Sequence, residues 1–141
     1  MAKKADPVVE VLNELRAAEL AAIVQYMRHH YLITGADGMP LAGEFKSVSI
    51  DEMKHAEVLA ERIDFLGGDP TTKPGPILVG AADLAAMATD DLAKEDQAVA
   101  DYRAAIKIAD KAGDVTTRRL LEDILADEEG HQDTFGSMLG K

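Results

Sequence analysis

The same arrangement of acidic and histidine residues occurs twice in this chain of 141 residues, and it limits the possible folds more than any other feature. Each half contains a lone glutamate followed 33 residues later by a Glu-x-x-His motif, and the second set lies 76 positions after the first. The six residues are Glu19, Glu52 and His55 in the first half and Glu95, Glu128 and His131 in the second. We therefore expect two similar halves whose six polar side chains have a common purpose.

Helix formers dominate the sequence, and helix-end signals divide it into four helical segments. Asp6-Pro7 is typical of a helix start, whereas Gly35, Gly67-Gly68 and Gly113 are typical of helix ends. The predicted helices span residues 7–34, 41–66, 81–111 and 114–138. A chain of this length is expected to form one domain, so we predict a single all-α domain over residues 1–141.

The connections between the predicted helices define the topology. Short turns join the first helix to the second and the third to the fourth, so each pair is antiparallel. The middle connection is about a dozen Pro- and Gly-rich residues and spans ~40 Å when extended, at ~3.3 Å per residue. A helix of about 27 residues has the same length at ~1.5 Å per residue. The sequence therefore predicts an antiparallel four-helix bundle with one long crossover between helices two and three.

Each predicted helix has an apolar stripe, which the six polar residues interrupt near the helix centre. Mid-helix positions of a bundle lie at one level whichever way the helices run, so four carboxylates and two imidazoles should converge in the core. Four ionised carboxylates are unstable in an apolar core, but two divalent ions would neutralise them. Glutamate and neutral histidine suit Fe(II) or Mn(II), with Zn(II) as a competitor. The predicted metal ligands are Glu19, Glu52, His55, Glu95, Glu128 and His131.

Composition and charge exclude several classes of function. The net charge of −11 argues against nucleic-acid binding and suits the attraction of cations. The absence of cysteine excludes disulfides, thiolate zinc sites and iron–sulfur clusters. No uncharged apolar run approaches the ~20 residues of a membrane span, and residues 1–14 carry charges where a secretory signal needs an apolar stretch. We expect a cytoplasmic protein that binds neither nucleic acid nor membrane.

The sequence around the six residues resembles the bacterioferritins, which are ferritin-like di-iron proteins. The resemblance covers about residues 8–139, and the segments that carry it are SIDEMKHA at 49–56, DEEGH at 127–131, and Asn13-Glu-Leu with Glu19, Gln25 and Tyr26. It implies a ferroxidase centre with two iron ions per subunit, bridged by Glu52 and Glu128 and capped by His55 and His131. Fe(II) would be oxidised by O2 or H2O2 and stored as a mineral inside a homo-oligomeric cage. Tyr26 would hydrogen-bond a ligand carboxylate or donate an electron.

The resemblance also implies that Met53 is a haem axial ligand. Met53 follows Glu52, so its side chain points ~100° away from the metal site. In bacterioferritins two such methionines, one per subunit, ligate a haem on the two-fold axis of a dimer, and thioether suits this role. The haem, as haem b or iron-coproporphyrin, would return electrons to the mineral for iron release, with a ferredoxin-type protein as the reductant. The apolar pocket expected around it consists of Leu20, Ile23, Val24, Met27, Ile50 and Ala56. Ordinary packing of Met53 in a subunit interface is the alternative.

Three departures from the family change what is expected. The chain ends ten residues after His131, which predicts the absence of the family's C-terminal fifth helix and favours a twelve-subunit cage over a twenty-four-subunit cage. Ser47 replaces a histidine of an accessory iron site, so that site is not implied even though Asp51 is present. Tyr102 is the repeat mate of Tyr26, and paired tyrosines resemble rubrerythrin. A rubrerythrin-like di-iron peroxidase is therefore the main alternative, and a non-catalytic haem-carrying module is a third.

Overall fold

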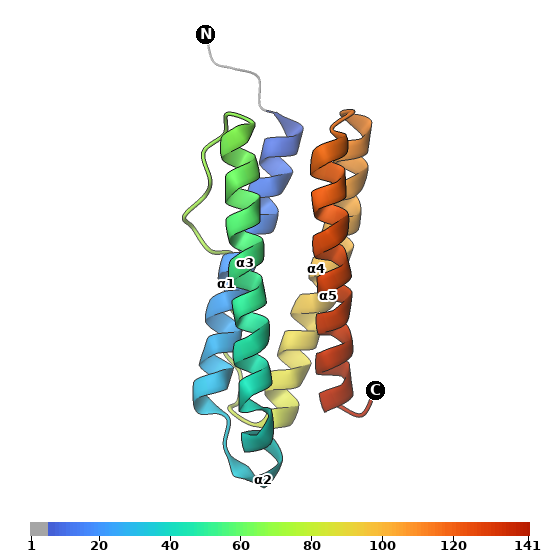
Figure 1. Cartoon of the computed structure of the whole chain (residues 1–141). Coiled ribbons are helices and arrows are strands. Elements are labelled where there is room, and N and C mark those ends of the chain that lie inside the picture. The colour runs from blue at the N-terminus through green and yellow to red at the C-terminus, as the bar shows by residue number, and fades with distance from the viewer. Residues whose placement is uncertain (1–5) are drawn as a thin grey trace.

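The computed structural model describes residues 6–141, and in this part of the chain there are helices and no β-strand (Figure 1). The four long helices are α1 (Pro7–Leu32), α3 (Ala42–Phe65), α4 (Leu84–Lys111) and α5 (Val115–Met138). A short helix, α2 (Gly35–Gly38), and a 3-10 helix, η1 (Met39–Leu41), lie between α1 and α3. The predicted all-α bundle is confirmed.

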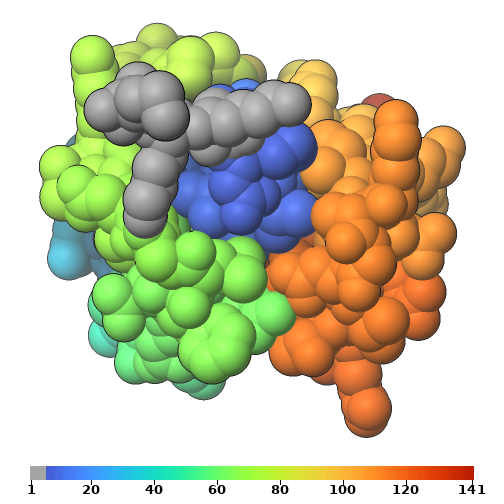
Figure 2. All heavy atoms as spheres, turned by 90° about the horizontal axis from the view of Figure 1, so that it is seen from above, coloured from blue at the N-terminus to red at the C-terminus, as the bar shows by residue number. Residues whose placement is uncertain are grey.

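The long helices follow the predicted topology with one crossover. In Figure 1, α1 runs downward from the N-terminal end, α3 returns upward, and residues 66–83 lead back down along the bundle. Helix α4 then runs upward, parallel to α3, and α5 runs downward. Helix α1 packs against both α3 and α4, and α4 packs against α5. Seen from above, the α1–α3 pair (blue and green) lies beside the α4–α5 pair (orange) (Figure 2).

Hydrogen bonds to aspartate side chains mark three helix starts. Asp6, Asp83 and Asp114 each accept a hydrogen bond from a backbone N–H in the first turn of α1, α4 and α5. Gly67 and Gly113 follow the ends of α3 and α4 with φ values of 82° and 72°, a conformation that glycine adopts without steric cost. These local signals explain why the helices were visible in the sequence.

Two predicted helix boundaries are wrong by two or three residues, and one connection predicted as a turn is helical. Helix α4 begins at Leu84 and not at residue 81, because Asp83 is extended and caps the helix. Helix α1 ends at Leu32 because Ile33 is already extended, with a ψ of 131°. Residues 35–40, which the sequence predicts as a turn, lie in α2 and η1.

The prediction that the chain lacks a fifth helix is not borne out. Helix α5 is the fifth α-helix in chain order, because the short α2 precedes α3, and α5 takes the fourth long position of the bundle. The argument for a twelve-subunit cage rested on the missing helix and loses its basis.

Two apolar clusters fill the bundle, one on each side of its middle. The first cluster connects the N-terminal half of α1 to α3, α4 and α5, and it includes Leu12, Leu15, Leu59, Tyr102, Leu121 and Ile124. The second connects the opposite half of the same helices, and it includes Ala22, Tyr26, Phe45, Val48, Met87 and Phe135. Burial of these stripes supplies most of the driving force for assembly of the four helices. The layer between the clusters is polar.

The crossover, residues 66–83, is held on the surface of α1 by hydrogen bonds. Asn13 Nδ2 donates to the carbonyl oxygen of Asp69 at 3.0 Å, and the backbone N–H of Gly75 donates to the carbonyl oxygen of Ala17 at 2.9 Å. Because the crossover has no helix or strand of its own, these contacts fix where it lies. The crossover therefore covers the side of the bundle formed by α1 and α4.

No helix among residues 6–141 is long and apolar enough to cross a membrane. Residues 1–5, which belong to the charged segment 1–14 considered for a secretory signal, lie outside the described residues.

Candidate metal centre

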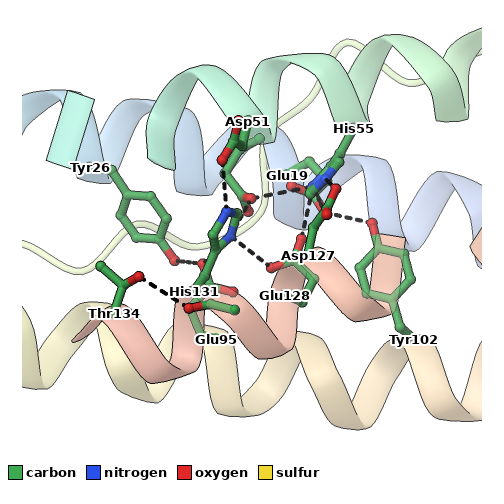
Figure 3. A network of polar contacts seen from close by, with 12 residues as sticks. Glu19, Tyr26, Asp51, His55, Glu95, Tyr102, Asp127, Glu128, His131 and Thr134 are labelled. Carbon is green, nitrogen blue, oxygen red and sulfur yellow. Dashed lines mark hydrogen bonds and ion pairs between the residues drawn. The ribbon is translucent and has the colours of Figure 1, made fainter. Parts of the chain in front are cut away.

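The six residues of the repeated pattern come together in the polar layer between the two apolar clusters. Glu19 projects from α1, Glu95 from α4, and the two Glu-x-x-His motifs from α3 and α5 (Figure 3). All six are buried, with no more than 6% of any of them exposed. The i, i+3 spacing places the glutamate and the histidine of each motif on one helical face, so both side chains reach the same space.

The donor atoms form two overlapping sets. Within each set, one donor atom from each of the four residues lies within 4.8 Å of the others. The first set comprises Glu19, Glu52, His55 and Glu128, and the second comprises Glu52, Glu95, Glu128 and His131. Glu52 and Glu128 belong to both sets, which is the arrangement needed for two carboxylates to bridge two ions.

Each imidazole lies among three carboxylates. His55 Nδ1 is 3.0 Å from Glu128 Oε1, 3.3 Å from Glu52 Oε1 and 3.7 Å from Glu19 Oε1. His131 Nδ1 is 3.0 Å from Glu52 Oε1 and 3.5 Å from an oxygen of both Glu95 and Glu128. Both rings therefore direct Nδ1 toward the carboxylates, where a lone pair on that atom can bind a metal ion.

Several buried oxygen and nitrogen atoms of the cluster make no hydrogen bond, although Glu52 Oε1 and Glu128 Oε2 lie within ion-pair distance of His131 Nδ1, at 3.0 and 3.5 Å. The atoms without a hydrogen bond are Glu19 Oε2, Glu52 Oε1, Glu95 Oε2, Glu128 Oε2 and His131 Nδ1. Glu19 Oε2 and Glu95 Oε2 have neither a hydrogen bond nor an ion-pair contact, and a buried polar atom in that state costs ~1–3 kcal/mol. Divalent cations would give each of these atoms a partner, and two such ions would balance the charge of four carboxylates. The residues present therefore fit a pair of divalent metal ions with oxygen and nitrogen ligands.

Burial and neighbouring charges perturb the ionisation of the cluster. Burial raises the pKa of Glu52 to about 8 and that of Glu128 to about 11, and the charge of Glu19 adds to both shifts. Burial also opposes ionisation of Glu19, but hydrogen bonds from His55 and Glu52 bring its pKa below the ordinary value. Burial alone would lower the pKa of His55, yet its hydrogen bonds with Glu128, Glu19 and Glu52 raise that pKa far above the ordinary value. In the metal-free protein, protons on Glu52, Glu128 and the two histidines therefore replace the metal ions in neutralising the cluster.

The metal-free protein is expected to lose stability as pH rises from about 5 to about 9. Glu52, Glu128 and both histidines keep protons in the folded state at pH values where the unfolded chain has released them, so rising pH favours unfolding. Glu19 acts oppositely, but only below its ordinary pKa of 4.5. Thermal unfolding with a chelator should give a melting temperature lower by about 5–10 °C at the higher pH. Added Zn(II) should reduce the difference, and equal melting temperatures without metal would contradict the assignment.

Two aspartates hold the far side of the imidazole rings. His131 Nε2 on α5 lies 3.1 Å from Asp51 Oδ2 on α3, and His55 Nε2 on α3 lies 2.9 Å from Asp127 Oδ2 on α5 (Figure 3). A carboxylate at Nε2 fixes the proton there and leaves Nδ1 free to bind metal. Sequence reasoning missed this pairing, although Asp127 lies 76 residues after Asp51 and the repeat was a usable signal.

Two tyrosines bind the lone glutamates in a symmetric way. Tyr26 on α1 donates a hydrogen bond to Glu95 Oε1 at 2.7 Å, and Tyr102 on α4 donates one to Glu19 Oε1 at 2.5 Å (Figure 3). In both glutamates the other oxygen, Oε2, is the atom without a partner. Burial raises the pKa of both phenols, and the charge of the bound glutamate adds to it, so both stay protonated as donors. The hydrogen bond expected for Tyr26 is therefore present.

A buried polar network near Tyr26 breaks the internal symmetry. Asp91 accepts a hydrogen bond from Gln25 Nε2 at 2.8 Å and lies 2.7 Å from His29 Nδ1, and all three side chains are buried. The repeat mate of Asp91 is Leu15, and that of His29 is Ala105. The network ties α1 to α4 on one side of the centre only. Nothing in the repeat pattern signalled it.

Met53 lies outside the bundle core, as its position next to Glu52 predicts. It is 50% exposed, and Ile50 on the same helix is 37% exposed. An apolar groove of about 480 Å³ on α1 is lined by Ile23, Val24 and Met27, among others. Ala56 was expected in this pocket but is buried, with 4% exposed, so it is not part of the surface.

Known proteins that this chain resembles in sequence belong to one family. A family model for the ferritin-like domain matches residues 9–141. A bacterioferritin of Desulfovibrio desulfuricans is 44% identical over 125 residues, which are 88% of this chain and 69% of that protein. A bacterioferritin of Brucella melitensis is 36% identical over 138 residues, which are 96% of this chain and 85% of that protein.

A solved structure resembles the whole bundle. It is an X-ray structure of a Desulfovibrio desulfuricans bacterioferritin whose subject is the di-iron site in different catalytic states. The similarity has a TM-score of 0.83 at 38% sequence identity and covers 93% of this chain and 77% of that chain.

Proposed function

We propose that this chain, which belongs to the bacterioferritins of the ferritin-like family, oxidises Fe(II) and stores the product as a mineral. The observation that carries this proposal is the pair of overlapping donor sets that share Glu52 and Glu128. Glu19 and His55 would complete the ligands of one iron ion, and Glu95 and His131 those of the other. This assignment gives a metal partner to every buried atom of the cluster that makes no hydrogen bond.

The reaction takes Fe(II) as its substrate and a small oxidant as the electron acceptor. The two iron ions supply the two electrons that reduce the oxidant. With H2O2, two Fe(II) and two protons give two Fe(III) and two water molecules; with O2, the same electrons and protons give H2O2. Asp51 and Asp127 hold His131 and His55 through Nε2, so that Nδ1 faces the site. Metal binding releases the protons that Glu52 and Glu128 hold near neutral pH.

Tyr26 and Tyr102 fix the lone carboxylates. Each tyrosine occupies one oxygen of a glutamate and thereby leaves the second oxygen for iron. Tyr26 is also close enough to Glu95 to serve as an additional electron donor, the second role considered for it. Positioning of Glu95 and electron donation would both depend on the hydrogen bond between Tyr26 and Glu95.

Storage of a mineral requires a hollow oligomer, and we propose a homo-oligomeric cage built from dimers. Purified protein is expected to sediment as a particle of many subunits, at least about ten times the 15.1 kDa of one chain. Sedimentation equilibrium gives this mass directly and distinguishes twelve from twenty-four subunits. A particle no larger than a dimer would leave no space for mineral and would rule out storage.

The exposed apolar surface around Met53 supports a haem shared by two copies of this chain. Met53 and Ile50 on α3 and Val24 in the α1 groove are exposed apolar side chains, which supports an apolar partner for these two helices. Two Met53 thioethers, one from each copy, are proposed as axial ligands of haem b or iron-coproporphyrin. The haem would supply one-electron transfer for iron release, with a ferredoxin-type protein as the reductant.

The paired tyrosines support one alternative, a rubrerythrin-like di-iron peroxidase. Fe(II) added in excess distinguishes the two functions. A ferroxidase with storage should consume oxidant in proportion to iron and build up a sedimenting Fe(III) mineral. A peroxidase should turn over H2O2 repeatedly with an external reductant and accumulate no mineral.

A further inference from the structure

A cavity of about 510 Å³ leads from the surface to the carboxylate cluster between α1, α4 and the crossover. Its floor includes Glu19 and Glu52, together with Tyr26 and Tyr102. These four side chains are buried, so the cavity ends at the predicted metal ligands themselves. The crossover forms one side through Gly75, Pro76 and Leu78.

The walls of this cavity are apolar, and small side chains keep it open. Five alanines contribute to the lining, together with Leu15 and Leu78; they are Ala17, Ala18, Ala22, Ala93 and Ala98. Methyl groups offer no ligand to an ion, so a hydrated Fe(II) ion that entered here would lose its water without compensation. O2 makes no strong hydrogen bonds to water and needs no such compensation, and uncharged H2O2 loses far less hydration free energy than an ion does.

Three charged residues outside the carboxylate cluster line the cavity, and we place them at its rim because all three are at least partly exposed. Lys94 donates a hydrogen bond from Nζ to the carbonyl oxygen of Pro76 at 3.1 Å, which holds a positive charge beside the crossover. Glu14 and Asp101 also lie at the rim, and Asp101 already accepts a hydrogen bond from Gln97. The rim therefore presents mixed charge and does not form an acidic funnel for cations.

The opposite side of the bundle offers a different surface. Asp51 and Asp127 project from α3 and α5, the two helices in front in Figure 1, and their side chains are 44% and 62% exposed. Each binds the outer nitrogen of a histidine whose inner nitrogen faces the cluster. On this side, carboxylate and imidazole donors form an uninterrupted series from solvent to the metal site, as passage of a cation requires.

We propose that the cavity between α1, α4 and the crossover is the route of a small uncharged oxidant, O2 or H2O2, to the centre, and that Fe(II) arrives on the Asp51–Asp127 side. This inference rests on the proposed ferroxidase function and assigns its two substrates to two faces of one subunit. The oxidant reaches Glu19 and Glu52 without displacing the residues that admit iron.

Two variants that narrow the cavity test the proposal. Ala18→Phe on α1 and Ala98→Phe on α4 place a large side chain in the lining, and Ala104→Phe, at an exposed position of α4 outside the cavity, is the matched control. Each protein is loaded without oxygen with Fe(II) and then mixed with O2 or with H2O2 in a stopped-flow instrument. We expect the rate of Fe(II) oxidation in the loaded centre to fall by about tenfold or more in both cavity variants and to be unchanged in the control.

Uptake of Co(II), followed by its visible absorbance, separates this proposal from the ferroxidase function. The Co(II) uptake rate and affinity should be unchanged in the cavity variants. Slower Co(II) uptake with unchanged oxidant rates would make the cavity a cation route and overturn the proposal, as would unchanged rates in both experiments. Failure of the unaltered protein to bind Co(II) would contradict the metal centre itself. If the cavity variants slow oxidation by only one of O2 and H2O2, the cavity is the route of that oxidant alone.

Discussion

Replacing Glu95 by alanine is expected to abolish the rapid phase of Fe(II) oxidation while the bundle stays folded. Glu95 belongs to only one of the two donor sets, so its loss removes a ligand from one iron position and leaves Glu52, Glu128 and His131 there. Removal of an outer-shell partner of a metal ligand typically costs ~10–100-fold, so loss of a ligand itself should slow the reaction by about 100-fold or more. Stopped-flow absorbance after Fe(II) and O2 are mixed measures the rate.

The fold should tolerate this change. Glu95 lies in the polar layer, and the apolar clusters on both sides of it remain complete. Tyr26 loses its acceptor at 2.7 Å, which is the main structural cost. Asp96→Ala, at the adjacent exposed acid of α4, is the matched control and should oxidise iron at the normal rate. A Glu95→Ala protein that is folded by circular dichroism and oxidises Fe(II) normally would exclude Glu95 from the centre.

Replacing Met53 by leucine is expected to remove ligation of the proposed haem completely. Leucine has nearly the volume of methionine, so the apolar contacts persist, but the thioether sulfur is lost. If the two sulfurs come from two copies of Met53, a single substitution in the chain removes both ligands. The absorbance spectrum of protein reconstituted with haem should lose the features of bis-thioether ligation, and haem content after gel filtration should fall to a small fraction.

Met27→Leu is the control for this prediction. Met27 is on α1 and lines the apolar groove on the same surface, so it is the other methionine within reach of a haem placed there. Its substitution should leave the haem spectrum unchanged. A result in which Met27→Leu removes the ligation and Met53→Leu does not would transfer the role to Met27. Normal ligation in both variants would leave Met53 as an ordinary interface residue.

The internal repeat in the sequence was sufficient to identify the six polar residues that converge in the core. The 76-residue offset and the helical period place Glu19 and Glu95, and the two Glu-x-x-His motifs, at mid-helix positions of an apolar stripe. The fold class also followed, because helix formers, aspartate caps and glycine ends are local signals. The errors at residues 33–40 and 81–83 arose where the decision between helix and extended chain depends on a single cap, as at Asp83.

Other parts of the site depended on contacts between helices. Asp91 and Leu15 occupy equivalent positions of the repeat, yet only Asp91 meets a histidine and a glutamine from α1 in the core. Asp51 and Asp127 looked like ordinary surface acids, and their role appears only when α3 and α5 bring each of them to the histidine of the other helix. The cavity above Glu19 exists because the crossover lies against Ala17 and leaves a space between α1 and α4.

The sequence by itself determined the helices, the faces they bury and the level at which the acids and histidines meet. It could do so because helical periodicity is a short-range property in which each residue's direction follows from its neighbours in the chain. Only the tertiary structure decided which polar groups pair across the bundle, which of their atoms remain without a partner, and where solvent reaches the centre. Those features depend on contacts between residues that are far apart in the chain, and no local pattern specifies them.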